Sequence, residues 1–356
     1  MRNKRLDALR MMAVLLVLGR HMEPSPRDIF LPFRILLDIW YRCGWIGVDL
    51  FFVISGFLVS GLLFKEHIKN GKIDLKRFFI RRGFKIYPPF YFLLIFTFLI
   101  LFIFNRPATL PQALSEFFLV QNYGPAIWGH TWSLAVEEHF YILIGLLLFF
   151  TSRTKALKQF SYIPVLFLSV AILLLTFRIL TWINIPFSYK THLFPSHLRI
   201  DSLLFGVFLS YHYYFNRERF LSMINGHRLK IIIACTLLIA PAVFIDLEGG
   251  AFLPTLGFTF LYLGFGGILS LILASKSDQS IPLLSALGVY SYSIYLWHLP
   301  IHSLGLRFLR DHFNIHLSYT QENIVYLTSS LIVGVAMAKI IEIPFLKIRD
   351  RIYQEV

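Results

Sequence analysis

The sequence predicts an all-α membrane protein with about ten transmembrane helices and both termini in the cytoplasm. The first observation is composition: 56% of the 356 residues are hydrophobic and 15% are charged, whereas a soluble domain carries about 25% charged residues. The mean hydropathy of +0.65 agrees with this. The other two observations are the apolar runs of spanning length and the unequal distribution of positive charge among the segments that join them.

Apolar runs long enough to cross a bilayer occur at ten places along the chain. We expect transmembrane helices near residues 7–22, 44–64, 86–104, 131–151, 160–181, 197–215, 229–246, 252–274, 284–305 and 323–346. With the N-terminus inside, most Lys and Arg residues of the connecting segments fall on the cytoplasmic side. This bias supports ten helices in a single membrane domain over residues 1–356.

Several classes of protein are disfavoured. The net charge of +14 is concentrated in particular loops, so we expect membrane lipid rather than nucleic acid as the surface partner. Cys43 and Cys235 are too few and too far apart for a disulfide framework or a metal site, and we expect no bound cofactor. The first apolar run carries charges and has no small-residue cleavage site, so no cleavable signal peptide is expected. The oligomeric state is not indicated.

The first predicted helix carries Asp7, Arg10, Arg20 and His21, and ionisable groups inside a spanning helix usually mark a functional site. Arg10 and His21 are eleven residues apart, which places them within about 20° of one helix face and about 16 Å apart along the axis. Asp7 lies about 40° from the same line. The alternative is that Asp7 pairs with Arg10 at the inner interface while Arg20 and His21 extend to the outer one.

The second predicted helix begins near Asp49, which the helix dipole favours at an N-terminus. Ser55 and Gly56 are small enough to let another helix approach closely. The segment that follows, residues 65–85, is the most basic in the chain. It is either a topology signal that faces anionic lipid or, through its arginine pair, a phosphate-binding element.

The fourth predicted helix opens with Ser133, Glu137, Glu138 and His139. Glu137 lies one helical turn after Ser133, so we expect a hydrogen bond between them. Stabilisation by the helix dipole would account for one of the two glutamates.

Three later helices carry polar groups. Arg199 and Asp201 begin the sixth, where a local ion pair is the alternative to a ligand contact. Tyr292 and Tyr295 lie deeper than the interfacial aromatic belt, which indicates a lined cavity. Glu342 near the end of the last helix fits an interfacial position.

These segments, in this order, resemble the acyltransferase-3 family of integral membrane acyltransferases. Seven motifs carry the resemblance: LDxLRxxA…H at Leu6–His21, GVDLFFVxSGF at Gly47–Phe57, RRxxRIxP at Arg81–Pro88, HTWSLxVEExFY at His130–Tyr141, RxDxLLxG at Arg199–Gly206, SYSxYLWHxP at Ser291–Pro300 and ExP at Glu342–Pro344. The resemblance covers nearly the whole chain.

The resemblance implies a multi-pass enzyme of the cell membrane that moves an acyl group, often acetyl, from cytosolic acyl-coenzyme A to a hydroxyl. The acceptor would be a carbohydrate or lipid-linked glycan of the cell envelope. Some family members append an SGNH domain, and we expect the stand-alone form here. Acyl-coenzyme A would be the donor substrate rather than a bound cofactor.

The family's motif residues map onto Arg10 and His21, onto Arg81 and Arg82, and onto Ser133 and Glu137. Because acyl transfer to a hydroxyl needs a base, we expect neutral His21 to be the general base. Glu137 would orient its ring, with Ser133 in the same catalytic group, and Arg10, Arg81 and Arg82 would hold the donor phosphates. Further substrate-binding residues are expected at Asp7, Lys85, Arg199, Asp201, Tyr292 and His298.

Three positions depart from the family pattern. Lys85 stands where a second arginine is usual, which keeps the charge but loses the planar fork. Arg20 replaces an apolar residue beside His21 and would disfavour protonation of that ring if it stayed close and unpaired. His139 replaces a glutamine.

Two other functions fit the intramembrane charges. The protein could be a lipid or sugar transporter or flippase that uses these charges as its pathway, although we see no internal repeat or paired broken helices of the kind that transporters favour. It could also be an inactive scaffold that keeps the fold.

Overall fold

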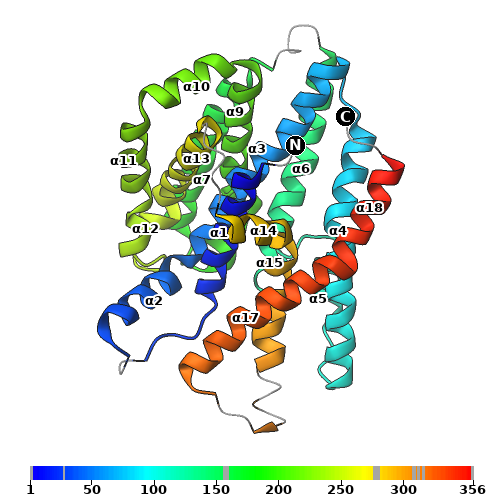
Figure 1. Ribbon diagram of the computed structural model, residues 1–356, viewed down its shortest axis with the longest axis vertical. Coiled ribbons are helices and arrows are strands. Elements are labelled where there is room, and N and C mark those ends of the chain that lie inside the picture. Colours follow the sequence, from blue (N-terminus) through cyan, green and yellow to red (C-terminus); the bar gives the residue numbers. More distant parts are fainter. Residues whose placement is uncertain are drawn as a thin grey trace.

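The computed structural model describes residues 3–26, 29–154, 160–275, 281–306, 310, 313–314 and 317–353, and within these ranges the chain is helical with no strand. Both chain ends lie in the upper half of the molecule in Figure 1. The predicted all-α class is confirmed for the part of the chain that is described.

The long helices form the body of the molecule. They are α1 (Lys4–Arg20), α3 (Gly47–Asn70), α4 (Leu75–Ile103), α6 (Trp132–Arg153), α7 (Ile163–Asn184), α9 (Ile200–Phe215), α13 (Phe258–Ala274) and α17 (Tyr319–Met337). Shorter helices join them: α2 (Leu31–Cys43), α5 (Leu110–Phe117), α8 (Tyr189–His192), α10 (Arg217–Gly226), α11 (Arg228–Ile239), α12 (Pro241–Phe244), α14 (Pro282–Leu287), α15 (Ser291–Pro300) and α18 (Ile343–Ile352).

Six helical stretches of the described chain are long and apolar enough to cross a membrane. They are Leu31–Asn70, Leu75–Ile103, Trp132–Arg153, Ile163–Asn184, Leu253–Ala274 and Tyr319–Ile352, and the bent stretch from Arg217 to Phe244 makes a seventh if it crosses as one span. The remaining predicted spans are helical but shorter, more charged or interrupted. The first corresponds to α1, the sixth to α9, and the ninth to α14, α15 and the π-helical turn Ile301–Leu306.

The basic segment 65–85 is not a loop, as we had expected, but mostly helix. Gly71, at a left-handed φ of 67°, ends α3, and its N–H donates to the carbonyl of His67. The Asp74 carboxylate then accepts the N–H of Arg77 at 3.0 Å and caps the start of α4. The connection is therefore one short turn, and Arg81 and Arg82 lie on α4.

Four short helices, α2, α5, α8 and α10, lie in segments between the predicted transmembrane helices and were not predicted. Each begins at or near a residue type that favours the start of a helix, such as Pro, Ser, Thr or Asn. Thr109, for example, forms a capping box with Gln112 at the start of α5.

Glycines allow the central helices to approach closely. At Gly56 on α3, a Cβ atom would lie 1.9 Å from the carbonyl oxygen of Leu203 on α9, and at Gly206 it would lie 2.3 Å from that of Val53. Small residues at a helix crossing are the usual way in which membrane helices pack. The expected close approach at Gly56 is confirmed.

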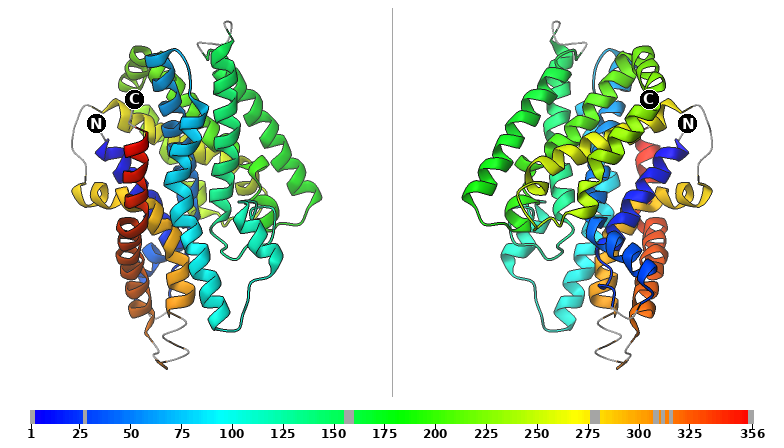
Figure 2. Two further views of the ribbon diagram at one scale, coloured as in Figure 1. Left: turned by 90° about the vertical axis from the view of Figure 1, so that its right-hand side faces the viewer. Right: turned by 90° about the vertical axis from the view of Figure 1, so that its left-hand side faces the viewer.

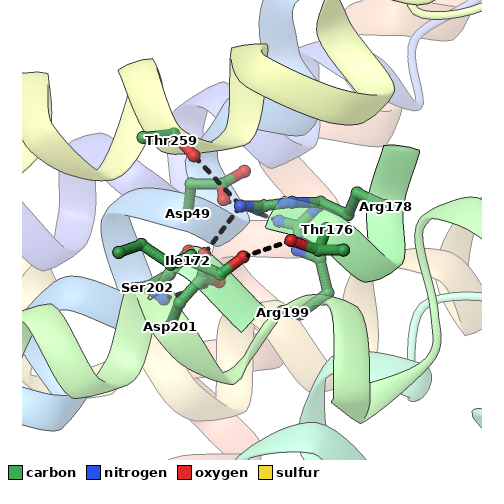
Figure 3. Close-up of polar contacts among 8 residues, drawn as sticks. All are labelled: Asp49, Ile172, Thr176, Arg178, Arg199, Asp201, Ser202 and Thr259. Atoms are coloured by element: carbon green, nitrogen blue, oxygen red, sulfur yellow. Dashed lines mark hydrogen bonds and ion pairs between the residues drawn. The ribbon is translucent and has the colours of Figure 1, made fainter. Parts of the chain in front are cut away.

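A buried cluster of four charged residues ties three of these helices together (Figure 3). Arg199 donates to Asp49 at 2.6 Å, and Arg178 donates to Asp201 at 2.8 Å. Arg178 also donates to the hydroxyl of Thr259 on α13 at 3.0 Å. All four charged side chains have an exposed fraction of 0%. Arg199 and Asp201 therefore form neither the local ion pair considered as the alternative nor an open ligand contact, but two pairs between helices, with Asp49 on α3 and Arg178 on α7.

The cluster predicts opposite effects for single and paired substitutions. Arg178→Met should lower the free energy of unfolding by about 3–5 kcal/mol, because it leaves the Asp201 carboxylate buried without its counter-charge. Arg178→Met/Asp201→Leu should recover most of that loss, since two apolar side chains then replace the pair. Thermal unfolding in one detergent or nanodisc preparation would measure both, and a single variant as stable as the parent would contradict the prediction.

Candidate active site

A cavity lies between α1, α3, α4, α6 and α15. Its walls are apolar over most of their area. The polar residues that line it are Arg10, Ser55, Arg82, Lys85, Ser133, Glu137, Tyr141, Ser291, Tyr292 and Tyr295. Five segments spread over the chain from residue 10 to residue 295 therefore meet at one enclosed space, which is the usual form of a ligand site.

Two of the cations in the cavity have no carboxylate bound to them. Neither Arg10 nor Arg82 forms an ion pair or hydrogen bond with another described residue, although the Arg82 guanidinium lies over the Tyr141 ring, 5.0 Å from its centroid. Both side chains are half-buried, and a cation that is partly removed from water gains from an anionic partner. The arrangement therefore favours an anionic ligand between α1 and α4.

The third cation, Lys85, is already paired. Its ammonium group bonds to one oxygen of Glu342, and the other oxygen accepts the hydroxyl of Ser293 at 2.6 Å. Glu342 is 2% exposed, so its carboxylate is buried inside the protein rather than exposed on its surface. It ends the π-helical turn Ala338–Glu342 between α17 and α18. Both this turn and α18 contact α4, and α18 runs beside α4 in Figure 2.

Tyr292 lines the cavity as expected, and it also ties α15 to α4. Its hydroxyl donates to the carbonyl of Ile86 at 2.9 Å, and its ring lies under Lys85 at 5.7 Å.

The two motif residues of α6 bind different partners from those expected. The Glu137 carboxylate accepts the hydroxyl of Tyr141 at 2.7 Å, and that hydroxyl lies 2.5 Å from Ser55. The Ser133 hydroxyl lies 2.5 Å from the hydroxyl of Tyr295, so the expected bond between Ser133 and Glu137 is wrong. Because Tyr295 donates its only O–H to the carbonyl of His130 at 2.7 Å, Ser133 must be the donor to Tyr295.

His21 lies outside this cavity, in a cluster of imidazole rings. Its ring is 5.1 Å from that of His298, which is 4.9 Å from that of His130. Tyr295 borders both spaces, because it lines the cavity and its ring lies 5.5 Å from His130 and from His298. The two ends of α1 thus serve different environments: Arg10 faces the cavity, and His21 faces the imidazole cluster.

The other predicted site residues lie away from the cavity. Arg81 donates to the carbonyl of Tyr353 at 2.6 Å and lies 3.7 Å from Asp350, which ties α4 to α18. Asp7 is buried where its backbone meets Gly288. Arg199 and Asp201 belong to the buried charge cluster.

Two departures from the family pattern have structural partners of their own. Arg20 donates to the hydroxyl of Tyr189 at 2.9 Å and lies over the ring of Tyr41 at 5.1 Å, so it is not left unpaired beside His21. Nδ1 of His139 lies 2.7 Å from the Ser196 hydroxyl. Neither residue lines the cavity.

Several residues of the site were not identified from the sequence. Glu116 on α5 is fully buried, and its carboxylate accepts the N–H groups of Ile127 and Trp128 at 3.0 and 3.2 Å. Burial raises the pKa of Glu116, and these backbone bonds oppose the rise. Through them Glu116 fixes the loop that carries His130. For Glu116, the signal in the sequence was a single acidic residue in a short amphipathic helix. For Arg178, which was also missed, it was a single charged residue in an otherwise apolar helix.

Among the described residues, no three His, Cys, Asp or Glu side chains are arranged to hold a metal ion, and Cys43 and Cys235 are unpaired thiols.

Comparison with known proteins gives one family. A family model described as an acyltransferase domain matches residues 3–342. Two similar proteins are the peptidoglycan O-acetyltransferase OatA of Listeria monocytogenes, 29% identical over 84% of this chain and 49% of its own, and the O-acetyltransferase OatA of Staphylococcus aureus, 28% identical over 83% and 50%. The chain spans about half the length of the curated relatives it matches. No solved structure matches it.

Proposed function

Because the chain belongs to the acyltransferase-3 family, we propose that it is a membrane-embedded O-acetyltransferase that uses cytosolic acetyl-coenzyme A and acylates a hydroxyl of a cell-envelope carbohydrate. Its family and its apolar helices make it a multi-pass protein of the plasma membrane. In our proposal α1, α9 and the interrupted α14–α15 segment complete ten spans of a single membrane domain, with both termini in the cytoplasm.

The observation that carries the proposal is the pair of guanidinium groups in the cavity, Arg10 and Arg82, neither of which is bound by a carboxylate of the described chain. Coenzyme A presents phosphates on a long flexible arm that ends in the thioester. Guanidinium groups bind phosphate through paired, charge-assisted hydrogen bonds. Held at these two residues, the donor could extend its thioester towards Ser133 and Tyr295 at the far wall of the cavity.

The chemistry then needs a base and a group that stabilises the oxyanion. In the proposed reaction the acceptor oxygen attacks the thioester carbon while His21 takes the hydroxyl proton. The C–S bond breaks, and the same proton passes from His21 to the departing sulfur. The hydroxyl of Ser133 could donate to the carbonyl oxygen as negative charge develops there, once a bound thioester displaces its hydrogen bond to Tyr295.

Glu137 has a different role in this scheme from the one that the sequence suggested. Its carboxylate holds Tyr141 and lies on the same cavity wall as Arg82. We therefore assign it to balancing and positioning the donor end of the cavity, rather than to orienting His21.

The acceptor class is proposed from the names of the relatives, one of which is a peptidoglycan O-acetyltransferase. A glycan hydroxyl outside the membrane would approach from the side of His21, because that residue lies at the end of α1 opposite to the N-terminus.

Isotope transfer tests the function and separates it from transport. Membranes containing the protein, supplied with acetyl-labelled acetyl-coenzyme A, should release coenzyme A and place the label on extracted glycans. A transporter or flippase would move lipid or sugar without forming a labelled ester. Labelled glycan in membranes that lack the protein would contradict the proposal.

His21→Ala should lower the rate of acetyl transfer at least about a hundredfold, which is the usual contribution of a general base. Arg20→Gln is the matched control, because Arg20 bonds to Tyr189 rather than to the reacting groups. Both variants would be compared at equal amounts of folded protein. Retained activity in His21→Ala would remove the base assignment.

Arg82→Gln should raise the KM for the acyl donor by about tenfold or more, because a charge-assisted hydrogen bond contributes about 1.5–3 kcal/mol. Arg81→Gln should leave that KM within about twofold, since Arg81 bonds to α18 outside the cavity. Initial rates over a range of donor concentrations would measure both. Equal effects of the two variants would contradict the assignment of Arg82 to the donor.

A further inference from the structure

The hydrogen-bonding state of His298 follows from its backbone contact. Its Nδ1 lies 2.5 Å from the carbonyl oxygen of Tyr295. A carbonyl can only accept, so Nδ1 must carry the proton, and in the neutral ring Nε2 is left with a lone pair. His130 is fixed in the opposite sense, because its Nε2 lies 3.1 Å from the carbonyl oxygen of Leu296 and its Nδ1 is bare.

Both nitrogens, Nε2 of His298 and Nδ1 of His130, are buried hydrogen-bond acceptors. His298 is 0% exposed and His130 is 4% exposed. Among the described residues, neither Nε2 of His298 nor Nδ1 of His130 has a hydrogen-bond partner. A buried polar atom without a partner is rare in folded proteins and often marks a functional site.

The His298 ring is also next to the proposed base. His21 and His298 are 5.1 Å apart at their centroids and tilted by 47°, so a small rotation of either ring brings a nitrogen of each into hydrogen-bonding range. The carboxylates around the site are engaged elsewhere: Glu137 with Tyr141, and Glu23 with His302 at 3.5 Å. His298 therefore presents a free acceptor nitrogen next to the N–H of His21.

We propose that His298 is the positioning residue of His21, with its bare Nε2 accepting the N–H of one nitrogen of His21 so that the other nitrogen faces the acceptor hydroxyl. A chain of fixed groups results: the carbonyl of Tyr295 sets the tautomer of His298, and His298 sets that of His21. The inference rests on the proposed role of His21 as the base.

A neutral acceptor suits this position. A carboxylate would bring a buried negative charge into an apolar region, whereas an imidazole lone pair orients the ring without that cost. When His21 takes the hydroxyl proton, the same lone pair stabilises the imidazolium that forms. The proton then leaves to the departing sulfur, and His298 keeps its own proton on Nδ1 throughout.

Two substitutions separate the two nitrogens of His298. The amide of asparagine extends only as far as Nδ1, so His298→Asn can keep a donor to the Tyr295 carbonyl but has no acceptor beside His21. The amide of glutamine extends to the position of Nε2, so His298→Gln keeps an acceptor there. Both side chains are polar and similar in bulk, and thermal unfolding would establish that both variants are folded.

We expect His298→Asn to lower kcat for acetyl transfer at least about tenfold with the KM for the acyl donor unchanged, and His298→Gln to retain kcat within about threefold. Equal losses of kcat in the two variants, a change confined to KM, or a wild-type rate in His298→Asn would each overturn the inference. His21→Ala is measured in parallel. If that variant is active, the base assignment itself fails, whereas an inactive His21→Ala beside an active His298→Asn removes only the role of His298.

Discussion

The structure depends on how four buried charges find partners in a region with no water to stabilise them. The four residues are Asp49, Arg178, Arg199 and Asp201, and their charges sum to zero. Exposing any one of these charged side chains to lipid would cost free energy. Their pairing fixes the registers of α3, α7 and α9. The guanidinium of Arg199 also lies over the rings of Phe52 and Trp132, at 5.8 and 5.6 Å. Phe52 lines the cavity, and Trp132 directly precedes Ser133, so the charge cluster supports the cavity wall from behind.

The site itself is divided into an ionic part and an imidazole part. The ionic part, with Arg10, Arg82 and the Lys85–Glu342 pair, draws its side chains from α1, α4 and the turn before α18. The imidazole part holds His21, His130 and His298. Both parts take a residue from α1, which explains why this helix carries charged residues at both ends at the expense of its hydrophobicity. The hydrogen bond between Ser133 and Tyr295 is where the two parts meet.

Sequence reasoning could predict what one helix does, but not which helices meet. Helical periodicity placed Arg10 and His21 near one face of the first helix, but it could not show that the two residues face different spaces. Tyr292 as a cavity residue follows from its depth. The partner of Asp49 is 150 residues away and that of Lys85 is 257 residues away, and no periodicity within one segment contains such contacts. Arg81 and Arg82 are adjacent on α4, yet the rotation of about 100° per residue points Arg81 towards α18 and Arg82 into the cavity. Arg178 was overlooked because one charge hardly changes the hydropathy of its helix.

The wall formed by Ser133 and Tyr295 has a consequence for the cell as well as for the reaction. An enzyme that takes its two substrates from opposite faces of a bilayer risks becoming a leak, and a leak of ions would discharge the potential that the membrane maintains. In the proposed reaction, the hydrogen bond between Ser133 and Tyr295 opens when a thioester reaches it and forms again afterwards. The same contact would then block ion flow in the resting enzyme and let a single acetyl group pass during turnover.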